Sequence, residues 1–306
     1  MSIPSEPAAA LLPVTSSPTI RDWVRLVRPA QWIKNLFVLA PLLFSGRATE
    51  SDAVVAALQA LVAFCLLASA VYAFNDVADR ESDRSHPTKR NRPVASGRIS
   101  TRSALGLSAG LILLGLGLAW LVTPRLALIA AGYLVLNLFY SVWLKHLVIL
   151  DVFAIAAFFL LRLLGGSAAI GVQPSIWLLI CGGLLALYLG FAKRRQELVL
   201  LGGDSASHRK VLGDYGPAFL DQMSVVLLAV TVVSYIMYTL SPERVAASGY
   251  RLTYSLVFVL YGVFRYLFLV HQRGGGSPTE TLLTDRSLII AVLLWSGYCG
   301  WVVYAH

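Results

Sequence analysis

The chain has 306 residues, of which 57% are hydrophobic and only 13% charged, and its mean hydropathy is +0.71. A soluble domain carries about 25% charged residues, so this composition excludes an ordinary soluble enzyme and predicts an all-α membrane protein. The net charge of +9 does not indicate a nucleic-acid partner, because the basic residues follow the loops between apolar segments. We therefore expect the membrane, and no nucleic acid, to be the large partner of this chain.

The first 20 residues are rich in Ala, Pro and Ser. They lack the basic start and the cleavage site of a signal peptide. We expect residues 1–20 to form a disordered cytoplasmic tail. No linker composition interrupts the rest, so residues 21–306 are expected to form a single transmembrane domain.

Nine apolar segments follow the tail, most of them close to the ~20 residues that cross a bilayer as a helix. They are residues 33–46, 54–75, 103–122, 125–142, 147–166, 175–192, 219–240, 252–270 and 287–305. The first is short, and we expect it to be tilted or partly interfacial. The sequence thus predicts a bundle of nine transmembrane helices.

The basic residues predict the orientation of this bundle. With the N-terminus placed in the cytoplasm, the outer loops hold only Arg47, Arg125, Arg244 and Arg251. Most other Lys and Arg residues then lie in the tail and the inner loops. Positive loops stay on the cytoplasmic side, so we expect a cytoplasmic N-terminus and an outer C-terminus.

An acidic cluster follows the second apolar segment. Asn75, Asp79 and Asp83 recur every four residues, so they share one face of a helix. Asp79 and Asp83 would repel each other without a cation, and Mg²⁺ binds a few carboxylates together with phosphate oxygens. These three residues are the predicted metal ligands, and Asp76, Asp79 and Asp83 the predicted catalytic carboxylates. A solvated helix end, with pairs such as Asp76–Arg80, is the structural alternative.

Basic residues surround this cluster in the sequence or end spans on the same predicted side. Lys89 and Arg92 follow it directly, where cations would neutralise a diphosphate. Arg162 lies deep in the fifth segment, and an ionisable residue there indicates function. The other candidates are Lys34 at the entrance of the first segment, where snorkelling is an equal alternative, Lys145 and the run Lys193-Arg194-Arg195. If the helices form a bundle, these groups converge on the acidic cluster.

The stretch from Asn75 to Asp83 resembles the N-D-x-x-D-x-x-x-D signature of the UbiA superfamily of intramembrane prenyltransferases, which are bundles of nine helices. The resemblance covers essentially the whole chain, including the two charged loops after the second and sixth segments. Within the superfamily, four stretches resemble the decaprenyl-phosphate phosphoribosyltransferases: Arg28–Asn35, Asn75–Arg90, Arg92-Pro93, and Lys193-Arg194 with Glu197-Leu198.

This resemblance implies transfer of 5-phosphoribose from 5-phosphoribosyl 1-pyrophosphate to a polyprenyl (decaprenyl) phosphate, with release of pyrophosphate, in the synthesis of a cell-wall arabinan precursor. It implies Mg²⁺ as cofactor and the bacterial inner membrane as location, with the active site facing the cytoplasm. Lys34, Tyr72 and Lys89 would hold the donor phosphates, helped by Arg92. Lys145, Arg162, Lys193 and Arg194 would orient the acceptor phosphate.

One departure from the superfamily separates the alternatives. Ordinary members carry a second aspartate-rich motif after the sixth span, whereas this chain has Lys193-Arg194-Arg195-Gln196-Glu197 there. The spacing from Tyr140 to Lys145 is also one residue longer than the family's Y-x-x-x-K element. An aromatic prenyltransferase that uses a polyprenyl diphosphate is the first alternative, and a lipid transporter or flippase the second. The sequence leaves a homo-oligomer open.

Overall fold

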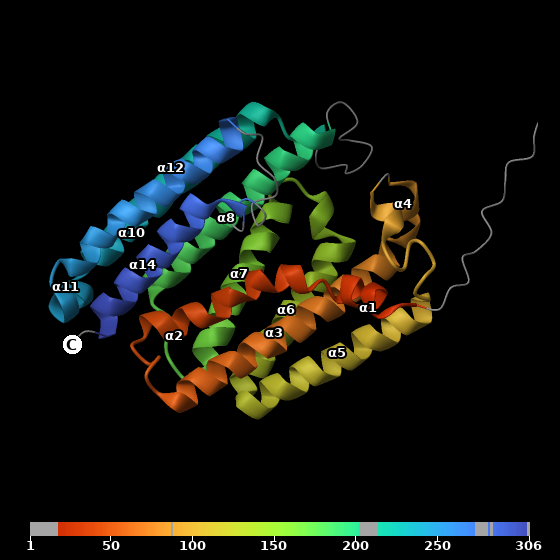
Figure 1. Cartoon of the computed structure of the whole chain (residues 1–306), viewed down its shortest axis with the longest axis horizontal. Coiled ribbons are helices and arrows are strands. Elements are labelled where there is room, and N and C mark those ends of the chain that lie inside the picture. The colour runs from red at the N-terminus through yellow and green to blue at the C-terminus, as the bar shows by residue number, and fades with distance from the viewer. Residues whose placement is uncertain (1–17, 87, 202–212, 273–280, 282–283, 305–306) are drawn as a thin grey trace, which may run out of the picture. The chain divides into compact units, whose positions relative to one another are not determined.

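The computed structural model describes residues 18–86, 88–201, 213–272, 281 and 284–304. Within these residues every regular element is a helix (Figure 1). The predicted disordered tail lies almost entirely outside the described part, and α1 already begins at Ile20. The chain divides into two compact units. The smaller unit comprises the described residues up to Trp32 together with Ala68–Leu113, and the larger unit comprises Ile33–Leu67 and the residues from Leu114 onward.

Long α-helices alternate with short α-helices and with 3₁₀ helices, which are marked η. In chain order the helices of the described residues are α1 (Ile20–Val27), η1 (Pro29–Leu39), α2 (Ala40–Phe44), α3 (Ser51–Ala78), α4 (Arg80–Ser85), η2 (Lys89–Asn91), α5 (Thr101–Val122), α6 (Pro124–Val142), η3 (Leu144–His146), α7 (Leu150–Ala169), α8 (Ile176–Leu201), α10 (Pro217–Thr239), α11 (Pro242–Ser248), η6 (Arg251–Ser255), α12 (Leu256–Gln272) and α14 (Arg286–Tyr304).

Eight helical segments in the described residues are long and apolar enough to cross a membrane. They coincide with the second to ninth predicted segments. The seventh of the eight observed segments, Arg251–Val270, comprises η6 and most of α12. The first predicted segment, residues 33–46, does not form one long α-helix, and its crossing of the membrane as a ninth span stays a prediction. There the chain forms the 3₁₀ helix η1, followed by the five-residue helix α2. The orientation of the spans stays a prediction.

The close approach of α7 accounts for this difference. A 3₁₀ helix has three residues per turn, so Asn35 and Val38 of η1 lie on the same face, and both are fully buried. That face meets Gly166 of α7, where an added Cβ would lie only 2.0 Å from the Val38 carbonyl oxygen. A glycine is therefore required at residue 166. At about 2.0 Å rise per residue, the 11 residues of η1 extend about 22 Å.

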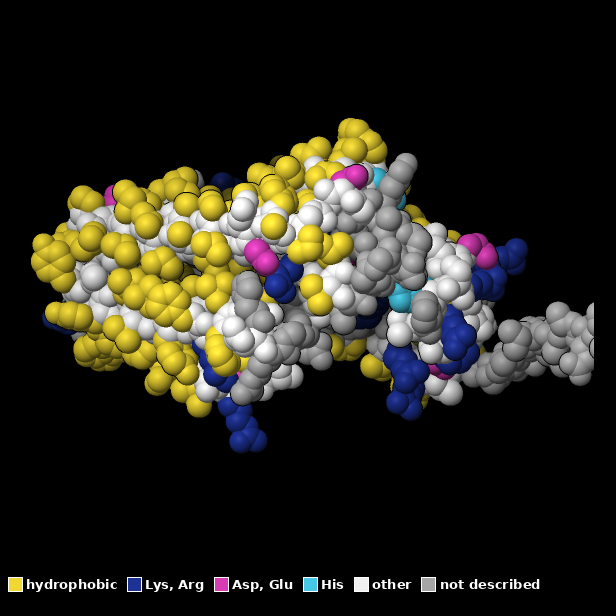
Figure 2. Space-filling model, turned by 90° about the horizontal axis from the view of Figure 1, so that it is seen from above, with side chains coloured by type: hydrophobic (Ala, Val, Ile, Leu, Met, Phe, Trp, Pro, Cys, Tyr) yellow, Lys and Arg dark blue, Asp and Glu magenta, His cyan; other side chains and the backbone are white. Residues whose placement is uncertain are grey.

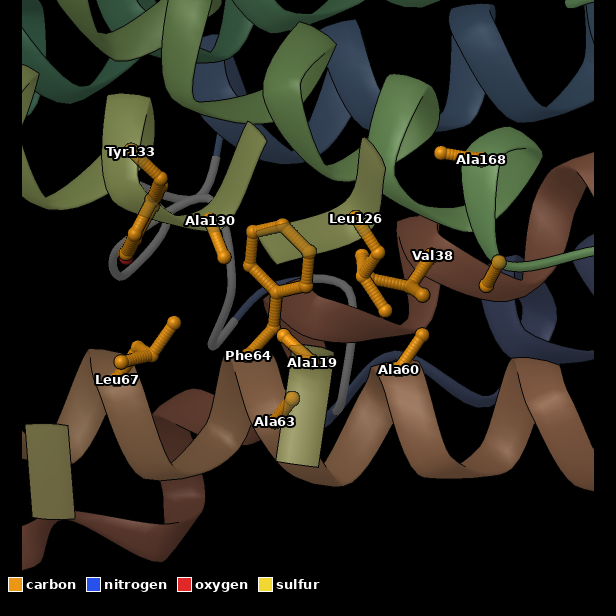
Figure 3. Close-up of a cluster of buried hydrophobic side chains, with 11 residues drawn as sticks. Val38, Ala60, Ala63, Phe64, Leu67, Ala119, Leu126, Ala130, Tyr133 and Ala168 are labelled. Carbon is orange, nitrogen blue, oxygen red and sulfur yellow. The ribbon is translucent and has the colours of Figure 1, made fainter. Parts of the chain in front are cut away.

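A hydrophobic cluster holds the middle of the larger unit. Figure 3 shows the ring of Phe64, on α3, pointing toward Ala130 and Leu126 of α6. The rings of Phe64 and Tyr133 meet edge to face, with centroids 5.4 Å apart. Alanines beside these large side chains allow the helices to approach closely, as is usual where helices pack inside a membrane. This cluster fixes the half of α3 that precedes the acidic residues.

The smaller unit has its own hydrophobic cluster, in which Leu26 of α1 packs with Ala73, Val94, Ile99 and Ala104. Outside that cluster, α1 begins with a capping box. The Thr19 hydroxyl donates to the Asp22 carboxylate at 2.7 Å. Arg98 Nε also lies 2.9 Å from Asp22 Oδ1. The bonds from Thr19, and then Arg98, hold the pKa of Asp22 below its usual value.

The long helices of the larger unit leave much apolar surface uncovered. On α6, for example, Leu128 is 75% exposed and Val135 51% exposed. Hydrophobic side chains cover most of the helical surface visible in Figure 2, while Lys and Arg are confined to a few places. A surface of this kind is suited to lipid tails and not to water. The protein is therefore a multi-pass integral membrane protein.

Candidate active site

The acidic cluster lies at the junction of α3 and α4 in the smaller unit. Asp79 separates the two helices, yet its N–H donates to the Asn75 carbonyl and the Asp83 N–H donates to the Asp79 carbonyl, both at 2.8 Å. Helical hydrogen bonding thus continues across the break. Asn75, Asp79 and Asp83 remain on successive turns, as their spacing predicts.

Two arginines bind the carboxylates of this cluster. Arg92 Nη1 lies 2.6 Å from Asp83 Oδ2 and 3.4 Å from Asp76 Oδ1. Arg28 forms a second ion pair with the same oxygen of Asp76. Both arginine side chains are 27% exposed, whereas Asp76 is only 1% exposed. The structure thus brings together the predicted residues Asp76, Asp83 and Arg92, and adds Arg28.

The residues of the cluster fit a magnesium ion. Asp76 Oδ2 is buried and has no hydrogen-bond partner in the described structure, although a buried polar atom normally has one. Among the described residues, no three His, Cys, Asp or Glu side chains are arranged to hold a metal by themselves. Mg²⁺ usually binds one or two carboxylates together with substrate phosphates and water. The oxygen of Asp76 that lacks a hydrogen-bond partner and the neighbouring Asp79 carboxylate are ligands of the kind that Mg²⁺ binds.

The predicted donor-binding residues of the smaller unit lie close to the cluster along the chain. Tyr72 is one turn before Asp76 on α3, and the Arg28 guanidinium carbon lies 5.0 Å from the centre of its ring. Lys89 begins the short helix η2 and is exposed. Sequence reasoning missed Arg28 as a site residue. The available signal was its place at the start of the resembling stretch Arg28–Asn35, directly before Pro29.

Arg162 lies in a separate buried network of the larger unit. Its Nε donates to Asn35 Oδ1 at 2.7 Å, and its Nη2 lies 3.1 Å from the Tyr133 hydroxyl. A third bond runs to the Phe158 carbonyl at 2.9 Å. The guanidinium also lies over the rings of Tyr133 and Phe159. Arg162 pairs with no carboxylate of the described residues, and Asn35 and Tyr133 are partners that the sequence did not indicate.

Arg194 is surrounded by acidic and phenolic groups at the facing ends of α7 and α8. Its Nε lies 2.6 Å from Asp151 Oδ2, and both side chains are completely buried. It also pairs with Glu197 and lies 3.2 Å from the Tyr140 hydroxyl. Tyr215 donates to the other oxygen of Asp151 at 2.9 Å. In this Asp151–Arg194–Glu197 cluster the carboxylates bind two nitrogens of the guanidinium, and Tyr140 binds the third.

Burial raises the pKa of the Tyr215 phenol above its ordinary value. The phenol therefore stays protonated at neutral pH and keeps donating to Asp151. At the same time its oxygen accepts the Ile149 N–H at 2.7 Å. Asp151 is thus satisfied on both oxygens, in contrast to Asp76.

The remaining predicted cations lie elsewhere in the larger unit. Lys34 is half-buried on η1 next to Asn35, and Lys145 is half-buried on η3. Lys193 is 46% exposed, with its Nζ 3.8 Å from Glu197. Arg195 forms an ion pair with Asp221 on α10. The expectation that these cations converge on the acidic cluster stays a prediction.

Comparison with known proteins identifies relatives of this chain. The chain is 35% identical over 294 residues to a decaprenyl-phosphate phosphoribosyltransferase of Mycolicibacterium smegmatis, and the match covers 92% of each chain. It is 33% identical over 277 residues to the protein of the same name from Corynebacterium glutamicum, which covers 89% of this chain and 83% of the relative.

The fold is also found among solved structures. A UbiA homologue from Archaeoglobus fulgidus bound to GPP and Mg²⁺ superposes with a TM-score of 0.70 at 21% identity, covering 93% of this chain and all of the homologue. The model of the UbiA prenyltransferase family matches residues 36–301. The chain therefore belongs to the UbiA prenyltransferase family.

Proposed function

We propose that this chain transfers the 5-phosphoribosyl group of 5-phosphoribosyl 1-pyrophosphate to a polyprenyl phosphate. The observation that carries the proposal is the 33–35% identity to decaprenyl-phosphate phosphoribosyltransferases over about nine-tenths of the chain. A match that covers 92% of the chain spans both the acidic cluster and the Lys193–Glu197 stretch. The proposed product is a polyprenyl phosphoribosyl phosphate, and pyrophosphate is released.

Magnesium would be held by Asn75, Asp79 and Asp83, with Asp76 offering its unpaired oxygen. When bound, the ion would neutralise the pyrophosphate and make it a better leaving group. Tyr72, Lys89 and Arg92 would bind the donor phosphates from the same unit, and Lys34 would contribute a further cation. A diphosphate carries more negative charge than one metal ion neutralises, so several cations are expected around it.

Arg162 and Arg194 differ in what they can offer a lipid phosphate. Arg162 uses three of the five N–H donors of a guanidinium, and no described carboxylate neutralises it. An anionic acceptor would supply that missing charge, because a lone cation in a membrane span is costly. Arg194 is already neutralised by Asp151 and Glu197. We therefore assign acceptor binding to Arg162, Lys145 and Lys193, and a structural role to Arg194.

The chemistry needs little from the protein beyond positioning and charge. A phosphate oxygen of the ionised lipid would attack C1 of the ribose while the bond from C1 to the pyrophosphate oxygen breaks. The attacking oxygen carries no proton, so no general base is required. Orientation of the two substrates and stabilisation of the leaving charge would supply the rate enhancement.

The test is an assay of the purified protein in detergent micelles with Mg²⁺. Radiolabelled 5-phosphoribosyl 1-pyrophosphate and a polyprenyl phosphate should give labelled lipid and an equal amount of pyrophosphate. A parallel reaction contains a polyprenyl diphosphate and 4-hydroxybenzoate. Prenylated benzoate without labelled lipid would replace the proposal by the aromatic prenyltransferase alternative. Lipid movement across vesicles without either product would favour a transporter.

A further inference from the structure

One face of α3 meets the end of α1 in the smaller unit. Ser69, Tyr72 and Asp76 are spaced i, i+3, i+7 and therefore lie in one row along the helix. The Ser69 hydroxyl donates to the Val27 carbonyl at 2.9 Å, and the Trp32 indole N–H donates to Ser69 at 3.0 Å. These bonds fix the chain on both sides of Arg28 against α3. The same row then continues to Tyr72 and Asp76, which Arg28 contacts.

Arg28 has an unfavourable backbone conformation. It caps the C-terminus of α1 with φ 52° and ψ 61°, in the left-handed region. Glycine is the usual residue at such a helix end, because a Cβ clashes with the backbone there. A residue with a long side chain at this position has to offset that strain through its other contacts.

The side chain of Arg28 has two contacts that offset the strain. Its guanidinium pairs with Asp76 Oδ1 and lies over the ring of Tyr72. Arg92 binds the same oxygen of Asp76, at 3.4 Å. Both arginines thus hold one oxygen of this buried carboxylate, and Oδ2 is left without a partner in the described structure.

We infer that Arg28 is a positioning residue, held in a strained conformation so that it fixes Asp76 and the ring of Tyr72 for a magnesium diphosphate. This inference rests on the proposed function only in that the acidic cluster binds the diphosphate of the donor. The planar guanidinium suits both tasks, because it can bind a carboxylate and stack on an aromatic ring at once. Arg28→Gly would relieve the backbone strain but would remove the contacts of the side chain with Asp76 and with the ring of Tyr72.

The experiment separates backbone strain from side-chain function with matched pairs of variants. Arg28→Gly and Arg28→Ala both remove the guanidinium, but only glycine relieves the strain. Ile149 is the other described non-glycine residue with a positive φ, at 69°. Ile149→Gly and Ile149→Ala therefore form the control pair. For each folded variant in detergent, the melting temperature and the binding of magnesium pyrophosphate are measured, the latter by calorimetry.

At both positions the glycine variant should melt at a higher temperature than the alanine variant. Both Arg28 variants should nevertheless lose magnesium pyrophosphate affinity by about ten- to a hundredfold, as expected when a hydrogen bond to a charged group no longer orients the site. Both Ile149 variants should bind like the wild type. Wild-type affinity in Arg28→Gly, or affinities that simply follow the melting temperatures, would overturn the inference.

The two proposals fail in different ways. If the wild type binds magnesium pyrophosphate and Arg28→Gly does not, the role of Arg28 stands even when no phosphoribosyl transfer is detected. If the wild type transfers phosphoribose and Arg28→Gly binds and reacts equally well, only the inference about Arg28 is wrong. A wild-type protein that does not bind magnesium pyrophosphate contradicts the inference directly.

Discussion

The two acidic clusters of this protein differ in how completely their carboxylates are satisfied. Asp151, in the larger unit, is bonded on both oxygens, to the completely buried Arg194 and to Tyr215. Asp76, in the smaller unit, is bonded on one oxygen only, and the arginines that bind it are 27% exposed. A buried ion whose partners are all in place has no free position for a ligand, whereas a partly satisfied group keeps capacity for one.

This difference supports the proposal that only one of the two clusters binds substrate. A cation already lies between Asp151 and Glu197, namely the guanidinium of Arg194. The acidic cluster at the α3–α4 junction combines an unpaired carboxylate oxygen with neighbouring carboxylates and accessible arginines. We therefore propose metal and donor binding at the acidic cluster of the α3–α4 junction, and a structural role in the packing of α7 against α8 for the Asp151–Arg194–Glu197 cluster.

The largest effect is expected from Asp79→Ala. Loss of a magnesium ligand should lower the transfer rate by about a thousandfold, in keeping with the several kcal/mol that a catalytic metal contributes. Rates are measured with both substrates saturating. The variant should remain folded, with a melting temperature within a few degrees of the wild type. Near-normal activity at low magnesium would contradict the metal assignment.

The second prediction concerns stability at the other cluster. Arg194→Met leaves Asp151 buried without its cation, which should cost about 3–5 kcal/mol of folding free energy. Adding Asp151→Leu should recover most of this loss, because apolar residues can replace a buried ion pair. Thermal unfolding in detergent measures both variants. If Arg194→Met is stable but specifically loses binding of the lipid phosphate, Arg194 is a ligand and not a structural residue.

A smaller effect is expected from Lys89→Ala. Lys89 is exposed, so its removal should not affect folding, but one point charge on the diphosphate is lost. The KM of the donor should rise by about tenfold, with the KM of the lipid nearly unchanged. Arg90→Ala, the next residue along η2, is the matched control and should change the KM less. Equal losses for both substrates would indicate that the loop has collapsed instead.

The smallest effect concerns Asp22, a carboxylate outside both clusters. Its pKa is lowered in the folded protein by the bonds from Thr19 and by Arg98. A lowered folded pKa contributes stability above the unfolded value of about 3.9, and this stability is lost as the pH falls through the folded pKa. The melting temperatures of the wild type and Asp22→Asn should therefore differ at pH 6 and converge in acid. A difference that persists at low pH would contradict this account.

The sequence predicted most of the fold because most apolar segments have the length of about 20 residues that a membrane-spanning helix needs. The exception, residues 33–46, is a segment whose helix type depends on packing against α7 at Gly166. No local pattern distinguishes a stretched 3₁₀ helix from a short α-helix. Length alone indicated that this segment was unusual.

The candidate site was predicted in part. Regular spacing placed Asn75, Asp79 and Asp83 on successive turns, and the ion pairs of Arg92 agree with its nearness in sequence to Asp83. The hydrogen-bond partners of Arg194 and Arg162 are more than 25 residues away in sequence, except Glu197 and Phe158. Such contacts depend on which helices are neighbours, and composition and spacing contain no information about that.

The most direct test of the account is the binding of magnesium pyrophosphate to three forms of the full chain in detergent. These are the wild type, Asp79→Ala, and the double variant Asp151→Leu/Arg194→Met. We expect Asp79→Ala to lose binding and the double variant to bind like the wild type. Retained binding in Asp79→Ala together with lost binding in a folded double variant would contradict the account, since the Asp151–Arg194–Glu197 cluster would then be the diphosphate site.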